Sequence, residues 1–172
     1  MTQEEILALI SKGESETIEF KENFEKETVE TVSAFANTKG GIIVVGISDD
    51  GGIKGIQIGK HTINNWLNQI SQSTEPALIP QVEVLNYQRK NIVIIKIAEF
   101  PIKPLSVKGK CFKRSGNANR IMTPQEIANM YLASASMSWD AFPAQESSME
   151  DIDTDKLNQL ANSCRIVVEC GD

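Results

Sequence analysis

The sequence predicts a mixed α/β domain, of the α+β kind, with a mixed sheet flanked by helices and a C-terminal tail. Three observations support this class. Residues 14–55 place a charged strand, a helix and a buried strand close together in the chain. Further strand patterns gather between residues 82 and 114, and the composition changes after residue 135. The chain has 172 residues, 41% of them apolar, which is enough for one core that needs no disulfide or structural metal.

The first part of the chain shows clear helix and strand periods. Apolar residues at helical spacing predict helices over 3–11, 27–38 and 59–73. Thr2 is placed to cap the first helix, and Gly13 follows its end. The alternating run 17–21 predicts a strand, and the β-branched run 42–47 predicts a central strand covered on both faces.

The later elements are shorter and end at strong turn signals. Asp50-Gly51 predicts a hairpin in which residues 53–56 pair back. Further strands are expected over 82–85, 92–97 and 110–114, the last followed by a loop at 115–119. Thr123-Pro124 predicts the start of a helix that runs to about residue 135. We therefore expect a domain over 1–135 and an acidic, partly helical tail or linker over 136–172, with a helix near 154–163.

Charge is distributed unevenly along the chain. The net charge of −6 argues against a protein that coats nucleic acid by bulk electrostatics. Residues 103–120, however, hold six bases and no acid, namely Lys103, Lys108, Lys110, Lys113, Arg114 and Arg120. Such a run can contact phosphates, or it can be a solvated strand edge, and charge alone favours the second interpretation.

The stretch that follows the basic strand has the composition of an anion-binding turn. Phe112 to Arg120 combines an aromatic residue and three bases with Ser115, Gly116 and Asn119. Consecutive backbone N–H groups in such a turn can form an anion-binding concavity. An ordinary structural turn carrying surface bases explains the residues equally well.

Three carboxylates suggest a second chemistry. Glu19 lies on the first strand and Glu14 five residues before it, Asp49 follows the buried strand, and Lys21 lies nearby. Converging carboxylates can hold Mg²⁺ or Mn²⁺ for phosphodiester hydrolysis. The spacing alone favours an exposed Glu19–Lys21 pair and a turn residue at Asp49.

Other common sites find little support. Gly40-Gly41 lies between a helix and a strand, the reverse of a phosphate-binding loop, so we interpret the glycines as a helix stop with tight packing. His61 is the single histidine, so a histidine-based catalytic or metal site finds little support. The three cysteines, without CxxC spacing, suggest reduced cytoplasmic thiols. The apolar runs are too short for a membrane helix, and the acidic N-terminus does not resemble a secretory signal peptide.

Several spaced motifs resemble one known family. They are Glu14-Ser15 with Glu19-Phe20-Lys21, Ala34-Phe35-Ala36-Asn37-Thr38-x-Gly40-Gly41, Val45-Gly46-Ile47-x-Asp49-Asp50-Gly51, Lys103-Pro104 and Phe112-x-Arg114-x-Gly116. In this order they are similar to the Schlafen AlbA-like domain of bacterial transcriptional regulators, and the similarity covers about residues 3–135.

The resemblance implies an α/β domain that binds nucleic acid and, as is common in the family, associates with itself. We expect a cytoplasmic protein that favours DNA over RNA and that binds nucleic acid rather than cleaving it. Phosphates would then be contacted by Lys108, Lys110, Lys113, Arg114, Ser115, Gly116, Asn119 and Arg120, with no cofactor required. In the regulators an ATPase-like region and a winged helix follow, and we expect this chain to be a stand-alone domain or the front portion of such a protein. Animal relatives imply the alternative, a metal-dependent endoribonuclease that holds Mg²⁺ or Mn²⁺ on Glu14, Glu19 and Asp49, with Lys21 at the scissile phosphate.

Overall fold

The computed structural model describes residues 2–135, together with 155, 156 and 159. The chain divides into two units, Met1–Met137 and Ser138–Asp172, and the first unit contains the two sheets and the four helices of residues 2–135. The predicted domain boundary at residue 135 remains a prediction. The expected helix near 154–163 lies almost entirely outside the described residues.

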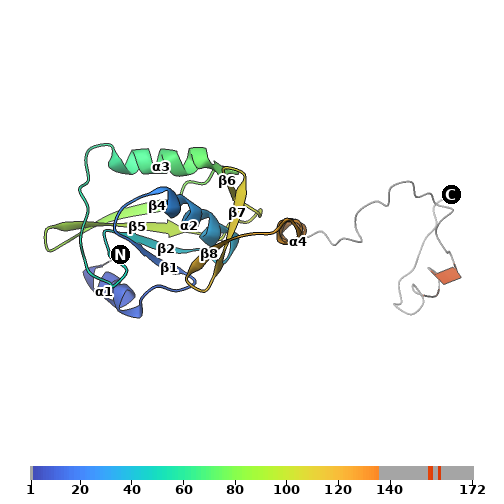
Figure 1. Cartoon of the computed structure of the whole chain (residues 1–172), viewed down its shortest axis with the longest axis horizontal. Helices are drawn as coiled ribbons and strands as arrows, with labels where there is room; N and C mark the ends of the chain where they lie inside the picture. Colours follow the sequence, from blue (N-terminus) through green and yellow to red (C-terminus); the bar gives the residue numbers. More distant parts are fainter. Residues whose placement is uncertain (1, 136–154, 157–158, 160–172) are drawn as a thin grey trace. The chain divides into compact units, whose positions relative to one another are not determined.

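Helices and strands alternate up to the third helix, and strands then follow one another until the fourth (Figure 1). The helices are α1 (Gln3–Lys12), α2 (Lys26–Asn37), α3 (Thr62–Ser73) and α4 (Pro124–Ser134). The strands are β1 (Ile18–Lys21), β2 (Gly41–Val45), β3 (Thr74–Glu75), β4 (Gln81–Tyr87), β5 (Lys90–Ile97), β6 (Ser106–Val107), β7 (Lys110–Ser115) and β8 (Ala118–Ile121). The predicted mixed α+β class is confirmed. None of the helices in residues 2–135 has both the length and the apolar character that crossing a bilayer requires.

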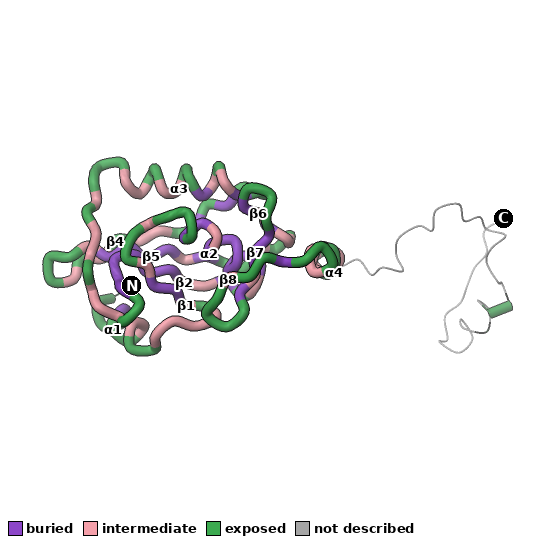
Figure 2. Tube along the Cα trace, viewed as in Figure 1, coloured by how far each residue is buried: buried purple, intermediate pink, exposed green. Residues whose placement is uncertain are grey.

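The first sheet has the strand order β1-β2-β5-β4 and is mixed. β1 runs parallel to β2, whereas the β2–β5 and β5–β4 pairs are antiparallel. On one face Val44 and Ile94 pack with Ile6 of α1 in one apolar cluster. On the other face Ile43 and Val45 pack with α2 and α3 residues. The central strands are therefore covered on both sides, as their unbroken apolar sequence predicts (Figure 2).

The second sheet has the order β3-β6-β7-β8 and is antiparallel throughout. Helix α2 contacts β2 and β5 of the first sheet as well as β6, β7 and β8 of the second. Most of its residues are buried for this reason, including Thr28, Thr31, Ser33 and Asn37, which are polar. Buried polar side chains need polar partners. Thr31 and Asn37 find theirs on the second sheet, at Asn119 and Phe112, and Ser33 donates to the Leu105 carbonyl just before β6. The Thr28 hydroxyl instead accepts from the Glu25 N–H at the start of the helix.

The predicted helix ends agree well with the structure. Thr2 caps α1 with a capping box to Glu5, and Thr123 caps α4 with a capping box to Glu126. Gly13 follows α1 with a φ of 70°, the left-handed backbone that glycine adopts most readily.

The hairpin predicted at Asp50-Gly51 forms only in part, and the loop predicted at 115–119 is wrong. Residues 53–56 form only isolated bridges, Ile47 with Ile53 and Ile56 with Asn91, so they are not a paired strand. The expected loop at 115–119 is a tight hairpin instead, because Ala118 and Asn119 already belong to β8. The short strands β3 and β6 have two residues each, too few for a periodic signal.

Candidate functional site

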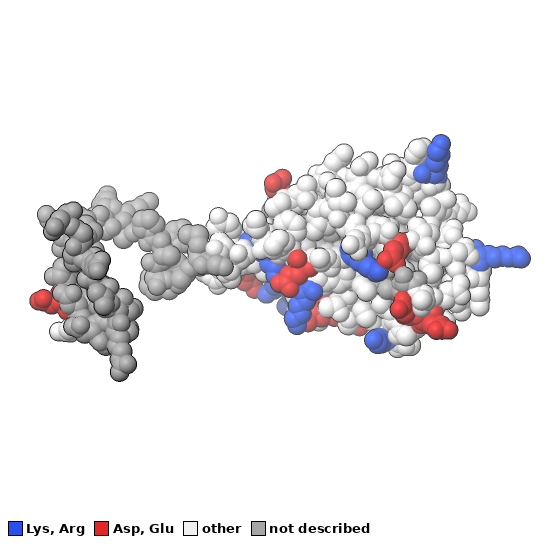
Figure 3. Space-filling model, turned by 180° about the vertical axis from the view of Figure 1, so that it is seen from behind, with Lys and Arg blue, Asp and Glu red and all other residues white. Residues whose placement is uncertain are grey.

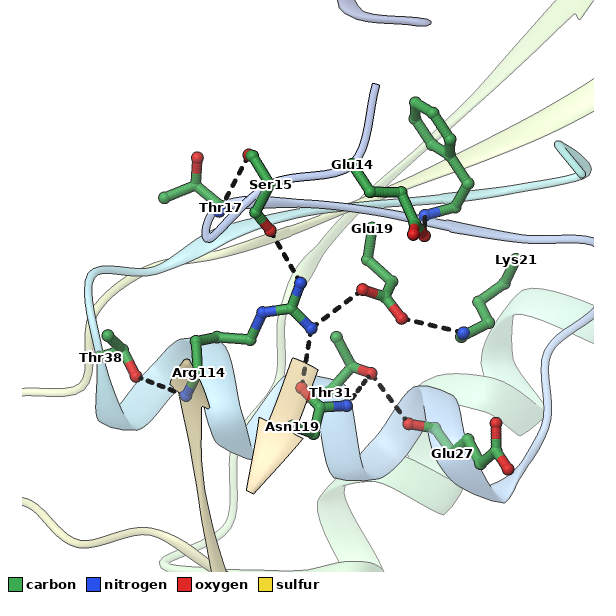
Figure 4. Close-up of polar contacts among 11 residues, drawn as sticks. Glu14, Ser15, Thr17, Glu19, Lys21, Glu27, Thr31, Thr38, Arg114 and Asn119 are labelled. Carbon is green, nitrogen blue, oxygen red and sulfur yellow. Dashed lines mark hydrogen bonds and ion pairs between the residues drawn. The ribbon is translucent and has the colours of Figure 1, made fainter. Parts of the chain in front are cut away.

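Arg114 on β7 reaches Glu19 on β1 and forms a buried ion pair (Figure 4). Its Nη1 lies 2.9 Å from Glu19 Oε2, and the side chains are 0% and 7% exposed. Arg114 Nη2 also donates to the Ser15 carbonyl at 2.7 Å, and the guanidinium lies 4.8 Å from the centre of the Phe35 ring. The guanidinium is thus enclosed by the first sheet, by α2 and by the segment that precedes β1.

A second cation contacts the same carboxylate. Lys21 Nζ lies 2.9 Å from Glu19 Oε1. Burial of Lys21 acts to lower its pKa, but the hydrogen bond to Glu19 and the charges of Glu19, Glu14 and Glu27 outweigh burial and raise it. Each carboxylate oxygen of Glu19 therefore has a cationic partner, and the negative charge of Glu19 is compensated within the protein.

Glu14 has a different partner. Its Oε1 accepts a hydrogen bond from the Phe20 backbone N–H at 2.9 Å. The carbonyls of Thr17 and Lys21 accept hydrogen bonds from β2 and from the residues just after it. Because successive residues of a strand point to opposite sides, the Phe20 N–H points away from β2. Glu14 thus satisfies a main-chain donor on the outer edge of β1.

These contacts decide whether Glu14, Glu19 and Asp49 fit a metal ion. Asp49 lies in the exposed turn after β2. Within residues 2–135, no three His, Cys, Asp or Glu side chains come together as a set that could hold a metal ion. A divalent cation at Glu19 would also stand beside the Arg114 guanidinium, which repels it. The carboxylates as arranged do not fit a metal site, and we derive no hydrolytic step through one.

The predicted phosphate-binding residues fall into two groups. Arg114 and Asn119 point inward: Arg114 Nη1 donates to Asn119 Oδ1 at 2.8 Å, and Asn119 Nδ2 donates to Thr31 Oγ1 at 2.7 Å. Thr38 Oγ1 accepts from the Arg114 backbone N–H. In this arrangement Arg114 and Asn119 fix the β7–β8 hairpin on α2 (Figure 4). Both terminal nitrogens of the guanidinium have internal partners, whereas the buried Arg114 Nε has no hydrogen-bond partner among the described residues.

The remaining members of the predicted set are accessible. Lys108, Lys110 and Arg120 are exposed, as are Ser115 and Gly116 at the β7–β8 turn. Lys113 stands opposite Arg120 in the β7–β8 register. Lys113 is partly exposed and forms an ion pair with Glu126 in the first turn of α4. The accessible cations therefore lie along β7, on the neighbouring strand and at the turn that precedes β7.

Several basic side chains elsewhere in the domain have a carboxylate partner. Ion pairs join Lys26 to Glu30, Lys39 to Glu16, Lys96 to Glu83 and Lys103 to Glu99. On the face of the molecule in Figure 3, some blue side chains lie beside red ones, whereas two at the right of the view project with no red side chain next to them. Among the residues of 2–135, Lys108, Lys110 and Arg120 have no such carboxylate contact, and the same holds for Lys12, Lys54, Lys60, Arg89 and Lys90. Lys108, Lys110 and Arg120 differ from those five in lying on or beside β7.

The segment from Ala34 to Gly41 holds a residue whose role the sequence did not reveal. Asn37, 2% exposed, donates through Nδ2 to the carbonyls of Leu105 and Phe112 and accepts from the Leu105 N–H through Oδ1. It is a buried polar clamp between α2 and the second sheet. The available signal was an amide within an otherwise apolar helix segment, which indicates a special contact but not its partner.

Gly40 has the packing role that the sequence predicted. Its φ is 72°, and a Cβ there would lie 2.6 Å from the Ile97 carbonyl oxygen. A larger residue would therefore push α2 away from β5.

Comparison with known proteins gives one family and one fold. The family model described as Schlafen, AlbA_2 matches residues 14–123. No curated protein matches the chain.

Two solved structures share the fold. The DIP2311 protein from Corynebacterium diphtheriae is 18% identical with a TM-score of 0.56, and the alignment covers 86% of this chain and 33% of that one. The N-terminal domain of a Nitrosomonas europaea protein, described as related to the ATP-dependent DNA helicase RecG, is 23% identical with a TM-score of 0.50. That alignment covers 69% of this chain and 92% of the domain. The chain thus spans about a third of the DIP2311 protein.

Proposed function

Because the chain belongs to the Schlafen, AlbA_2 family, we propose that it binds nucleic acid through the second sheet. The observation that carries the proposal is the group of exposed cations without carboxylate partners, Lys108, Lys110 and Arg120, on or beside β7. The solved domain from a protein related to a DNA helicase has the same fold, which agrees with a DNA-handling context. DNA is the favoured ligand, and regulation of transcription is the biological role that we propose.

The chemistry of the contact is phosphate recognition. Lys108 and Lys110 flank the turn before β7, and Arg120 lies on β8. Lysine and arginine side chains that reach phosphates release condensed counterions, so affinity falls steeply as salt rises. The backbone N–H groups at the Ser115-Gly116 turn add donors at the other end of β7. Such contacts position a duplex but carry no base sequence information.

The net charge of −6 is compatible with this role because the ligand contacts a local group of cations. Arg114 and Asn119 are not part of the proposed contact. They support it from beneath, since their side chains anchor β7 and β8 to α2 and β1.

A salt titration of fluorescence anisotropy tests the proposal. We expect a labelled DNA duplex to bind, and the triple variant Lys108→Ala, Lys110→Ala, Arg120→Ala to bind more weakly. Its slope of log K against log salt should be smaller by about 3 if each side chain contacts one phosphate. The control Lys54→Ala, Lys60→Ala, Arg89→Ala removes three exposed charges elsewhere. Equal losses in both triple variants would place the contact outside the second sheet.

A further inference from the structure

The two outer edges of the first sheet differ in their main-chain hydrogen bonding. At the β1 edge, the Phe20 N–H donates to Glu14 Oε1 at 2.9 Å. The Ile18 carbonyl accepts from the Ser15 N–H, also at 2.9 Å. Arg114 holds this covering segment in place through the Ser15 carbonyl. The β1 edge is thereby closed to any further strand, as protein sheets commonly require.

The β4 edge has no comparable cover. β4 spans seven residues, and β5 pairs with one side of it along the whole length. On the outer side, the Asn86 carbonyl accepts from Gln3 Nε2 at 3.0 Å. In an antiparallel strand the N–H and C=O of one residue point to the same side and alternate along the chain, so Val82 and Val84 also face outward. Within residues 2–135, neither has a hydrogen-bond partner on that side.

The centre of β4 carries an exposed apolar side chain, Val84, whereas the other two exposed residues of the strand, Gln81 and Asn86, are polar. Val84 is 50% exposed, although Val93, its pairing partner on β5, is fully buried. An open edge without proline or bulge, carrying a half-exposed valine at its centre, is a template for one more strand. Figure 1 shows β4 and β5 as neighbouring strands that extend beyond the helices at their shared turn.

We propose that the β4 edge pairs with β4 of a second copy of this chain, antiparallel, about a twofold axis at Val84. Val84 then stands opposite its own counterpart, and Val82 opposite Asn86 of the other copy. The exposed valines cover each other in this register. Glu83 stands opposite Leu85 of the other copy, whereas a twofold axis one residue earlier would place the two Glu83 carboxylates face to face, which is unfavourable.

The contact is expected to be weak and to depend on concentration. One strand edge buries little area compared with the roughly 1,200–2,000 Å² of stable interfaces. The resulting dimer would join two first sheets into one continuous sheet of eight strands, since each contributes four. The second sheets, which carry the proposed nucleic-acid contact, take no part in the pairing, so the proposal stands independently of that function.

Sedimentation equilibrium of the full chain over a range of concentrations tests the pairing. The expected result is a mass that rises with concentration from the monomer value of 19.0 kDa towards twice that value. Val84→Lys places two like charges on the axis and should raise the dissociation constant at least tenfold. The control Ile121→Lys changes an exposed residue on the edge of the second sheet, at 57% exposure, and should leave the mass curve unchanged.

Three results would overturn the proposal: a monomer at every concentration, a dimer that survives Val84→Lys, or a dimer that Ile121→Lys dissociates equally. If the chain is a monomer at every concentration, the β4 edge would instead be available to pair with an extended segment of a different protein. Circular dichroism verifies that each variant is folded. The spectrum of Val84→Lys is expected to match that of the parent chain because Val84 is half-exposed.

A cysteine cross-link tests the register. In a background with Cys164→Ser and Cys170→Ser, Val84→Cys should form a disulfide-linked dimer on oxidation, because hydrogen-bonded antiparallel partners lie about 5.5 Å apart at Cα, within disulfide range. Asn86→Cys is the matched control on the same strand. Its thiols would lie roughly 14 Å apart across the axis, since they are four residues out of register at about 3.4 Å each. Cross-linking of Asn86→Cys but not Val84→Cys would contradict the proposed axis.

Discussion

Arg114 on β7 and Glu19 on β1 form an ion pair that is almost completely buried, with Arg114 Nη1 2.9 Å from Glu19 Oε2. The two residues belong to different sheets. Sequence patterns assigned the arginine to phosphate binding and the glutamate to metal binding. Their pairing gives both charges an internal role, and it ties the hairpin of the second sheet to the edge of the first.

Breaking this pair from one side should destabilise the domain strongly. Arg114→Ala removes a cation from a buried carboxylate, and Glu19→Gln leaves the guanidinium without its counter-charge. Each is expected to lower the free energy of unfolding by about 3–5 kcal/mol, because an uncompensated buried charge is costly. Urea denaturation followed by circular dichroism measures the change.

The double variant Glu19→Leu, Arg114→Met supplies the control for this prediction. It removes both charges, so it should lose less stability than the sum of the two single variants. If Glu19→Gln were as stable as the parent chain, the ion pair would have no structural role.

Asn37→Leu should also be strongly destabilising, although the side-chain volume is nearly preserved. The change leaves the Leu105 N–H and the Phe112 carbonyl buried without their amide partner, whereas the Leu105 carbonyl keeps the hydrogen bond from Ser33 Oγ. Losses of this kind cost about 1–3 kcal/mol for each group left unsatisfied. Thermal unfolding compares this variant with Asn64→Ala, which alters an exposed amide of α3 and should change the melting temperature little. Similar melting temperatures for the two variants would argue against the clamp.

The Lys113–Glu126 pair should restrain nucleic-acid binding. Glu126→Gln removes the carboxylate that occupies Lys113, so the lysine becomes available to a phosphate. We expect the affinity for duplex DNA to increase about two- to tenfold, in line with the modest energy of an exposed ion pair. Thr123→Ala is the control, since it removes the α4 cap while leaving Glu126 in place. An increase with Thr123→Ala as well would point to loosening of α4 as the cause.

The same pair defines a pH dependence. The hydrogen bond from Lys113, together with the Thr123 backbone N–H, lowers the pKa of Glu126 from 4.5 to about 2. A carboxyl group with a lowered folded-state pKa contributes stability above pH 4.5, and this contribution is lost as the pH falls towards 2. Carbon-detected NMR should find the Glu126 titration midpoint near 2 in the parent chain. Lys113→Ala should move it back towards 4.5, and an unchanged midpoint would exclude Lys113 as the cause.

Divalent cations should not be needed for nucleic-acid binding. Both oxygens of Glu19 already have cationic partners, and Glu14 is occupied by the Phe20 N–H. We expect EDTA to leave the anisotropy titration unchanged. We also expect labelled tRNA to remain intact with Mn²⁺, both in the parent chain and in Glu14→Gln. Shortened tRNA that appears only with Mn²⁺, and that disappears in Glu14→Gln while the variant stays folded, would contradict this arrangement.

Much of the first sheet could be predicted from the order of the residues alone. The unbroken apolar run of β2, the caps at Thr2 and Thr123 and the glycine after α1 are local signals, because each depends on residues a few positions apart. The same holds for the mixed class, which follows from the sequence of helical and strand periods. The motifs that resemble Schlafen AlbA-like domains also lie in the sequence itself, and the family match confirms them.

The roles of the charged residues depended on the tertiary structure. Glu19 and Lys21 share one face of β1 in the sequence pattern, but Arg114 joins them from a distant strand, and no local period connects the two positions. The hairpin at 115–119 was missed because its strands are short and its pairing is decided by contacts with α2. Sequence determined where the helices and the longer strands form, because those preferences are local. Tertiary structure alone decided which charges face solvent, because burial and ion pairing arise only when distant segments meet.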